Sequence, residues 1–271
     1  HGLLPLSWSL DHAGPMTQTA EDAALILGSI AGYDPKDPSS LDAPIQDYSA
    51  SLDKGIRGLR IGVLAGPIIR ALHPEVETAM TEALETMKGL GAELQEDVLL
   101  PAIEFGSAAN TTIIMAEATA YHQRWLESQL EDYGQEVRTR LTMGRFLPAT
   151  LYIQANRARR LIREEILRAL DQLDLLALPM LPLPAPRIGE EQVRLGDSSV
   201  DLRTAITHYS GLFNLTGLPA ISVPCGFTSE GLPVGFQLAG RPLEEGTLLR
   251  AAHAYQEATS WRRRRPPLTV G

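Results

Sequence analysis

The sequence predicts an α/β fold, and two groups of apolar segments carry this prediction. LRIGVLAG at 59–66 is a β-branched run bounded by glycines, a helical pattern follows from 74 to 90, and AELQEDVLL at 92–100 alternates well enough for a second strand. Three further runs are short and nearly all apolar, as in strands buried on both faces of a mixed or parallel sheet: 174–179, 219–224 and 234–240. A strand–helix–strand unit with further strands indicates the α/β class.

Helices account for most of the remaining sequence. Thr19 and Asp22 resemble a capping box ahead of an apolar helical pattern that stops at Gly32, and the stretch 33–58 is typical of a long surface loop. Between 101 and 172 the apolar residues follow helical spacing, with breaks at Gly134 and Pro148. A closing amphipathic helix is expected over 243–258. The proline-rich stretch 178–189 predicts an extended loop.

Composition bounds the class of protein. The chain has 271 residues, of which 44% are hydrophobic and 21% charged, and no apolar run approaches the roughly 20 residues that cross a bilayer. We therefore expect a single compact unit over 1–271 with no membrane partner. One cysteine fits a reducing compartment, so a cytoplasmic location is expected. The formal charge of −9 argues against nucleic acid as a partner, and the basic run 262–265 is read as a solvated tail.

The chain shows no catalytic motif that works alone. It lacks a G-x-S-x-G elbow, an HExxH motif and a glycine-rich phosphate loop, so we expect no metal and no cofactor. Cys225 is interpreted as a small buried hydrophobe, with a catalytic thiol as the alternative. The three lysines, Lys36, Lys54 and Lys88, lie in loops or at a helix end. We expect solvated amines there, because a catalytic lysine must be desolvated or held by neighbours.

Several runs resemble one enzyme family in the same order. They are PLSWSLDHAGPMTQTAEDAALILGSIAGYDPKDPSS, GLRIGVL, PAIEFGSAANTTIIMAEATAYH, DLLALPMLPLPAP and FNLTGLPAISVPCGFTSEGLPVGFQLAGRPLEEGTLLRAAHAYQ. Together they cover almost the whole chain and resemble the C-terminal portion of amidase-signature hydrolases. The resemblance implies a large mixed, largely buried sheet flanked by helices, here incomplete, and hydrolysis of a small carboxamide through an acyl-enzyme.

The resemblance also places the central chemistry outside these residues. In the family a serine attacks the amide, a second serine in a cis peptide relays protons, and a lysine is the base. All three belong to a region that precedes the segment matched by GLLPLSWSLDHAGPM. None of the three is therefore assigned to a residue here, and the chain alone is expected to be inactive.

Two charged residues are expected to support this chemistry by resemblance. Asp11 matches a family aspartate that pairs with an arginine beside the nucleophile, with a loop or cap aspartate as the alternative. Arg140, in GQEVRTRLTMG, aligns with an arginine that binds the substrate carboxylate in glutamine-using members. The alternative for Arg140 is an exposed helix arginine, one of several arginines in this part of the sequence.

A third position separates the branches of the family. Glutamine amidotransferase A-type subunits carry an aspartate for the substrate's amino group where this chain has Thr207. Without a carboxylate the charge-assisted contact to an ammonium is lost, so a general amidase is the favoured hypothesis. Tyr209 and Ser210 would line its acyl pocket, although a structural tyrosine is an equal alternative. A non-catalytic binding fragment and an amidotransferase subunit remain as other hypotheses; the amide and the assembly state, with a homodimer as one option, stay open.

Overall fold

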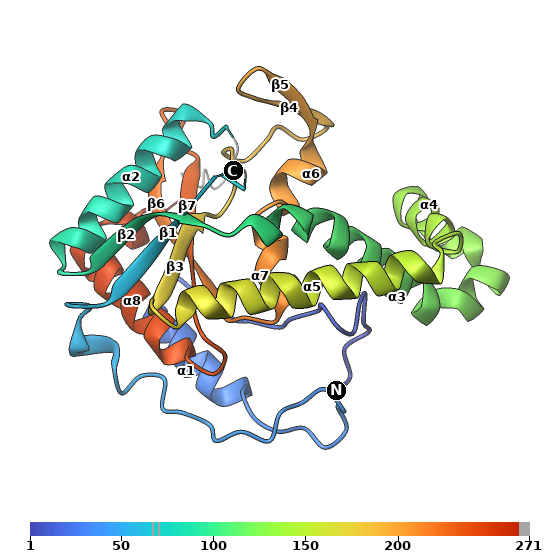
Figure 1. Ribbon diagram of the computed structural model, residues 1–271, viewed down its shortest axis with the longest axis horizontal. Coiled ribbons are helices and arrows are strands. Elements are labelled where there is room, and N and C mark those ends of the chain that lie inside the picture. Colours follow the sequence, from blue (N-terminus) through green and yellow to red (C-terminus); the bar gives the residue numbers. More distant parts are fainter. Residues whose placement is uncertain (67, 70, 266–271) are drawn as a thin grey trace, which may run out of the picture.

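A five-stranded mixed sheet forms the centre of the molecule (Figure 1). The computed structural model describes residues 1–66, 68–69 and 71–265. In sheet order the strands are β2 (Glu93–Leu99), β1 (Arg60–Ala65), β3 (Leu175–Pro179), β7 (Pro233–Ala239) and β6 (Ala220–Phe227). β1 runs parallel to β2 and β3, whereas β7 is antiparallel to β3 and β6. The α/β prediction and the strand–helix–strand unit over 59–100 are thereby confirmed, and the two strands of this unit are parallel.

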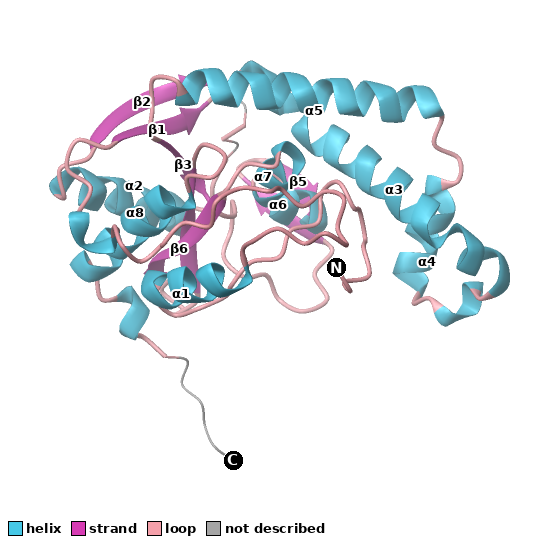
Figure 2. Cartoon of the chain, turned by 90° about the horizontal axis from the view of Figure 1, so that it is seen from below, coloured by secondary structure: helices cyan, strands magenta, loops and turns pink. Residues whose placement is uncertain are grey.

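Helices lie on both sides of this sheet (Figures 1 and 2). The longer ones are α1 (Ala20–Ile30), α2 (Pro74–Gly89), α3 (Gly106–Ser128), α4 (Gln135–Gly144), α5 (Ala149–Leu170) and α8 (Glu245–Ala258). Short 3-10 turns are η1 (Leu52–Lys54), η2 (Pro101–Phe105), η3 (Leu130–Asp132) and η4 (Trp261–Arg263). Thr19 caps α1 by accepting from the N–H of Asp22, and the helical breaks fall at Gly134 and Pro148, as the sequence predicts.

β3 separates two hydrophobic cores because successive side chains of a strand point to opposite faces. Leu176 and Leu178 belong to the core beneath α3 and α5, while Leu175 and Ala177 belong to the core beneath α2 and α8. Every residue of β3 is buried. This agrees with the prediction that the run 174–179 is a strand covered on both faces.

The prediction of burial on both faces is wrong for β6. Ala220, Ser222 and Pro224 are exposed, whereas Val223 and Cys225 face the core. The reason is that β6 contributes to only one of these two cores, because Val223 and Cys225 belong to the core beneath α2 and α8, whereas the described residues of the core beneath α3 and α5 include none from β6. An antiparallel strand commonly packs one face on a core and leaves the other near solvent.

Three elements were not anticipated. A separate hairpin pairs β4 (Gln192–Leu195) with β5 (Ser198–Asp201), and two short helices follow, α6 (Leu202–Thr207) and α7 (Ser210–Thr216). The signal for the hairpin was present, because a Gly-Asp dipeptide between two alternating runs is typical of a two-residue β-turn. α6 and α7 are too short for helical spacing to stand out.

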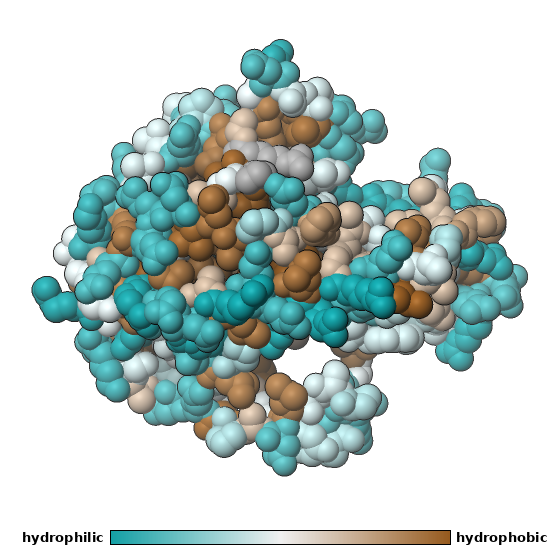
Figure 3. Space-filling view, in the orientation of Figure 1, coloured by the Kyte–Doolittle hydropathy of each residue, from teal (hydrophilic) through white to brown (hydrophobic). Residues whose placement is uncertain are grey.

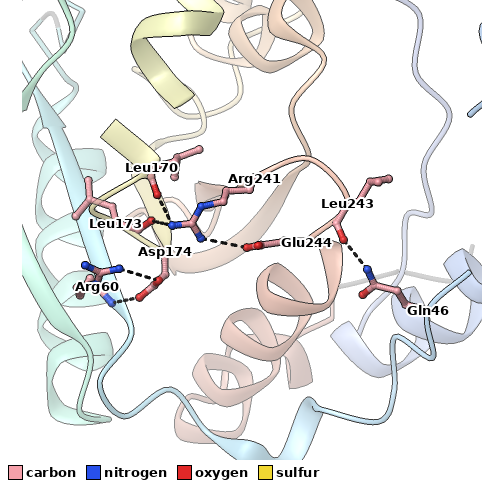
Figure 4. Close-up of polar contacts among 8 residues, drawn as sticks. All are labelled: Gln46, Arg60, Leu170, Leu173, Asp174, Arg241, Leu243 and Glu244. Carbon is pink, nitrogen blue, oxygen red and sulfur yellow. Dashed lines mark hydrogen bonds and ion pairs between the residues drawn. The ribbon is translucent and has the colours of Figure 1, made fainter. Parts of the chain in front are cut away.

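Arg241 ties the sheet to the end of α5 (Figure 4). Its guanidinium donates to the carbonyl oxygens of Leu170 and Leu173, at 2.7 Å for Leu173, and lies 3.3 Å from the carboxylate of Glu244. The last carbonyls of a helix have no partner within the helix, and a cationic side chain satisfies them well.

In the basic run near the end of the chain, Arg263, Arg264 and Arg265 are exposed, as predicted for a solvated tail, whereas Arg262 is half-buried. Arg262 forms an ion pair with Glu257 at 2.5 Å, and the guanidinium of Arg264 lies 4.4 Å from the centre of the Phe227 ring. Pro266 and Pro267, which follow this run, lie outside the described residues. Within the described residues, no helix combines the length and apolar character needed to cross a membrane.

Several large apolar side chains are exposed in the first 45 residues, and Figure 3 shows apolar surface on the face drawn there. They include Leu3, Leu4, Trp8, Met16, Leu25, Ile30 and Ile45. Exposed apolar side chains that form a contiguous patch are typical of a face that contacts other protein.

Candidate functional site

The segment Leu6–Asp11, near the beginning of the described chain, forms a tight turn. Leu10 and Asp11 donate their backbone N–H groups to the carbonyl oxygen of Ser7 at 3.0 and 2.8 Å. The Asp11 carboxylate closes the same turn, because its Oδ2 accepts from the N–H groups of Leu6 at 2.7 Å and Ser7 at 3.1 Å. Aspartate commonly closes turns by bonding to nearby backbone N–H groups. The contacts recorded for the exposed Asp11 are thus those of a loop aspartate.

Glu117 of α3 binds this turn from the protein interior. Its side chain is only 4% exposed, and it accepts from Ser7 Oγ at 2.5 Å, Ser9 N at 3.1 Å and Ser9 Oγ at 2.7 Å. The Tyr152 hydroxyl of α5 donates to the same carboxylate at 3.0 Å. Burial by itself raises the pKa of Glu117, but the hydrogen bonds from Ser7, Ser9 and Tyr152 outweigh burial and hold the pKa below its ordinary value. Glu117 is therefore an ionised, fully engaged carboxylate.

Arg159 completes this arrangement from α5. Its guanidinium donates to Ser9 Oγ at 2.9 Å and to the Ser9 carbonyl oxygen at 2.8 Å. Ser9 therefore bonds both to an anion and to a cation, each largely withdrawn from water. Sequence reasoning did not identify Glu117 or Arg159, although a glutamate one helical turn after Ile113, within an apolar stretch, was a usable signal.

α7 holds the turn from another side. The Asn214 side chain donates to the carbonyl oxygen of Leu10 at 3.2 Å, and the same carbonyl lies 2.8 Å from Nδ1 of His12. Leu10 itself is buried in the core shared by α3, α5 and α7. The turn is thus held on its polar side by side chains and on its apolar side by packing.

Two of the residues predicted to line an acyl pocket lie at the beginning of α7. Tyr209 is fully buried within the same core as Leu10, and its ring lies 4.8 Å from that of His208. The hydroxyl of Ser210 donates to the carbonyl oxygen of Ile206 at 3.0 Å. Both contacts are those of residues that stabilise local structure.

A small cavity lies between the beginning of α3 and the α6–α7 segment. Its lining residues are Ile103, Gly106, Ser107, Asn110, Thr111, Thr207, His208, Gly211 and Leu212. Thr207 thus faces a cavity with a polar wall, and its hydroxyl donates to the carbonyl oxygen of Arg203 at 2.8 Å. Within the part of the chain that the structure describes, the buried Oδ1 of Asn110 has no hydrogen-bond partner.

Arg140 lies on α4 and is joined to α6 through a shared carboxylate. Glu136 Oε1 is 2.9 Å from Nη2 of Arg140 and 2.9 Å from Nη1 of Arg203. Because Thr207 is one turn after Arg203, the structure brings the helix of Arg140 and the helix of Thr207 together at this ion-pair cluster. The pair between Arg140 and Glu136 is also the one expected of an exposed helix arginine.

Other residues considered as catalytic groups have ordinary structural environments. Lys36, Lys54 and Lys88 are all exposed, which confirms the prediction of surface amines. Cys225 is 1% exposed, and burial raises the pKa of its thiol to about 12. A thiol with so high a pKa is almost entirely protonated at neutral pH, so Cys225 has the character of a buried hydrophobe.

The fold defines an α/β protein whose mixed sheet is covered by helices and whose polar clusters lie among α3 to α7. The chain belongs to the Amidase family, because the family model described as Amidase matches residues 1–249. This finding confirms the resemblance to amidase-signature hydrolases.

Relatives and solved structures agree with this membership. A protein named Amidase from Pseudomonas putida is 44% identical over 268 residues, which are 98% of this chain and 57% of that protein. The A-type subunit of glutamyl-tRNA(Gln) amidotransferase from Thermosynechococcus vestitus is 36% identical, with 99% of this chain and 59% of that protein aligned. The chain therefore spans less than two thirds of the length of these relatives.

A solved structure shows the same fold. It is described as a vestigial protein complex that reveals the evolutionary origins of an s-triazine catabolic enzyme. One of its chains superposes with a TM-score of 0.88 at 30% identity, covering 94% of this chain and 55% of that chain. The mixed sheet flanked by helices is thus the fold of this family.

Proposed function

We propose that residues 1–271 form one C-terminal unit of an amidase that hydrolyses a small neutral carboxamide through a serine acyl-enzyme. In this proposal the nucleophilic serine, the relay serine and the lysine base come from residues outside these 271, and this chain supplies sheet, pocket wall and site support. The exposed apolar side chains of the first 45 residues support packing against further protein. A cytoplasmic location and a homodimer belong to the same proposal.

The ion pairing of Arg140 is the observation that supports an uncharged substrate. The guanidinium of Arg140 lies 2.9 Å from Glu136, which pairs with Arg203 as well, so Arg140 is held in an ion-pair cluster and is less available to a substrate carboxylate. Thr207 offers a hydroxyl and no charge to an amino group. A substrate with neither a carboxylate nor an ammonium group fits both residues. Hydrolysis of an amide is supported by membership of the Amidase family and by the P. putida relative.

A component of a glutamine amidotransferase is the second candidate. It is favoured by the relative from T. vestitus, whose name assigns it to glutamyl-tRNA(Gln) amidotransferase. Thr207 argues against it, because the aspartate expected for a glutamine-using site is missing.

Ammonia release by the longer polypeptide that contains this chain tests the proposal. We expect release from neutral aliphatic or aryl carboxamides without partner subunits, little release from glutamine, and none from residues 1–271 alone. Arg140→Gln should leave kcat/KM for a neutral amide nearly unchanged. Release from glutamine only when partner subunits are added, with no release from neutral amides, would support the amidotransferase instead. A native mature protein that begins at His1 by intact mass would contradict the enzyme proposal.

A further inference from the structure

Glu117 is the buried acidic residue around which the N-terminal turn is organised. Four donors from Ser7, Ser9 and Tyr152 surround its carboxylate, at 2.5 to 3.1 Å. Three of these donors come from residues more than 100 positions earlier in the sequence. A buried carboxylate that accepts several hydrogen bonds fixes the groups that donate to it, because leaving it unpaired is costly.

α3 contacts the turn with two neighbouring side chains of one face. Ile113 and Glu117 are four residues apart and both are buried, so they lie one helical turn apart. Ile113 shares its core with Leu10, while Glu117 binds Ser7 and Ser9. These two contacts therefore fix the turn both in its distance from α3 and in its position along the helix axis.

Arg159 fixes the direction of the Ser9 hydroxyl. Because the guanidinium of Arg159 donates to Ser9 Oγ, that hydroxyl directs its own hydrogen towards Glu117. The second bond from Arg159 to the Ser9 carbonyl oxygen holds the backbone at the same point. α3 and α5 thus both bind the turn through the same residue, Ser9.

The same turn connects two parts of the candidate site. Asp11 closes the turn by bonding to Leu6 and Ser7, and Leu10 accepts from Asn214 of α7. α7 begins at Ser210, directly after Tyr209, and the neighbouring Thr207 lines the cavity. A displacement of Ser7 and Ser9 would move Asp11 and loosen the contact with α7.

We propose that Glu117 is a positioning residue of the amidase site, which holds the turn Leu6–Asp11 and its contact with α7 in the arrangement that catalysis requires. This inference rests on the proposed function. Arg159 and Tyr152 act with Glu117, and none of the three needs to touch the substrate.

Glu117→Gln in the longer, active polypeptide tests the proposal, because glutamine keeps the shape and removes the charge. We expect kcat for a neutral amide to fall about 10- to 100-fold with little change in KM, as for a small misplacement of supporting groups. Hydrogen exchange at the backbone amides of Leu6, Ser7 and Ser9 should become faster, while exchange in the central sheet stays slow. Ser9→Ala removes only the hydroxyl and provides a milder variant in case Glu117→Gln fails to fold.

Glu165→Gln is the matched control. Glu165 of α5 also accepts a backbone hydrogen bond, from Ala102 N at 2.8 Å, but it does not contact the turn. We expect this variant to lower thermal stability without lowering kcat. Unchanged kcat in both Glu117→Gln and Ser9→Ala, in an active enzyme, would overturn the positioning role. An inactive wild-type polypeptide would instead count against the proposed function, and unchanged exchange in the turn would still refute the role of Glu117.

Discussion

Asp174 accepts a hydrogen bond from the backbone N–H of Arg60, with 2.8 Å between Oδ2 and N, and its Oδ1 lies 3.4 Å from the Arg60 guanidinium (Figure 4). These two residues lie at the beginning of β3 and β1, and the Arg60 carbonyl oxygen accepts from the N–H of Asp174 in return. The pair therefore sets where two central strands start relative to each other.

Asp174→Asn should lower the free energy of unfolding by about 1–2 kcal/mol, because a charge-assisted bond becomes a neutral one while the partly exposed ion pair contributes little. Urea unfolding measures the difference. Asp171→Asn is the control, since Asp171 is exposed just beyond α5 and should lose no stability. Equal stability of both variants would contradict the role of Asp174.

The effect of Asp174 should depend on pH. Burial raises the pKa of Asp174, but hydrogen bonds from Arg60 outweigh burial and hold the pKa below its ordinary value of 3.8. A lowered folded-state pKa contributes stability that is present above the unfolded pKa and is lost as pH falls through the folded pKa. The difference in stability between wild type and Asp174→Asn should therefore shrink below about pH 4.

Gly144→Ala should destabilise the contact between α3 and α4. An added Cβ would lie 2.1 Å from Thr119 Oγ1 and 2.6 Å from the Met115 carbonyl oxygen, and the latter is backbone that cannot rotate away. We expect a loss of about 1–3 kcal/mol, measured by urea unfolding, as for other overpacked sites.

Gly134→Ala is the control for this prediction. Gly134 precedes the same helix, and an added Cβ there would meet no atom within 4 Å. Its effect should be about 0.5–1 kcal/mol, the difference between glycine and alanine at an N-cap position. A Gly144→Ala variant as stable as Gly134→Ala would show that α4 can shift without loss.

Cys225 should be unreactive in the folded protein. With burial raising the thiol pKa to about 12, roughly one thiol in ten thousand is ionised at pH 8. We expect iodoacetamide at pH 8 to label the protein in urea but not the native protein. Mass spectrometry measures the extent of labelling. In the longer, active polypeptide, Cys225→Ala should retain the rate of amide hydrolysis. Rapid labelling of the native protein, together with loss of activity in Cys225→Ala, would instead support a catalytic role for the Cys225 thiol.

The strands and helices could be predicted where local pattern and tertiary environment agree. The run 174–179 is apolar throughout because β3 has a core on each face, and Thr19 marks a helix start because it caps α1. β6 differs, since its apolar residues did not reveal that it lies at the edge of the sheet. The hairpin β4–β5 was missed although its Gly-Asp turn was visible in the sequence.

The sequence by itself determined the family, the alternation of strands and helices, and the surface position of the three lysines. These depend on order and composition along the chain, which folding does not alter. Only the tertiary structure decided that Glu117 and Arg159 both form hydrogen bonds with Ser9, and that Glu136 forms ion pairs with both Arg140 and Arg203. Such contacts join residues as many as 150 positions apart. Their partners are chosen by helix packing, and no local pattern records that choice.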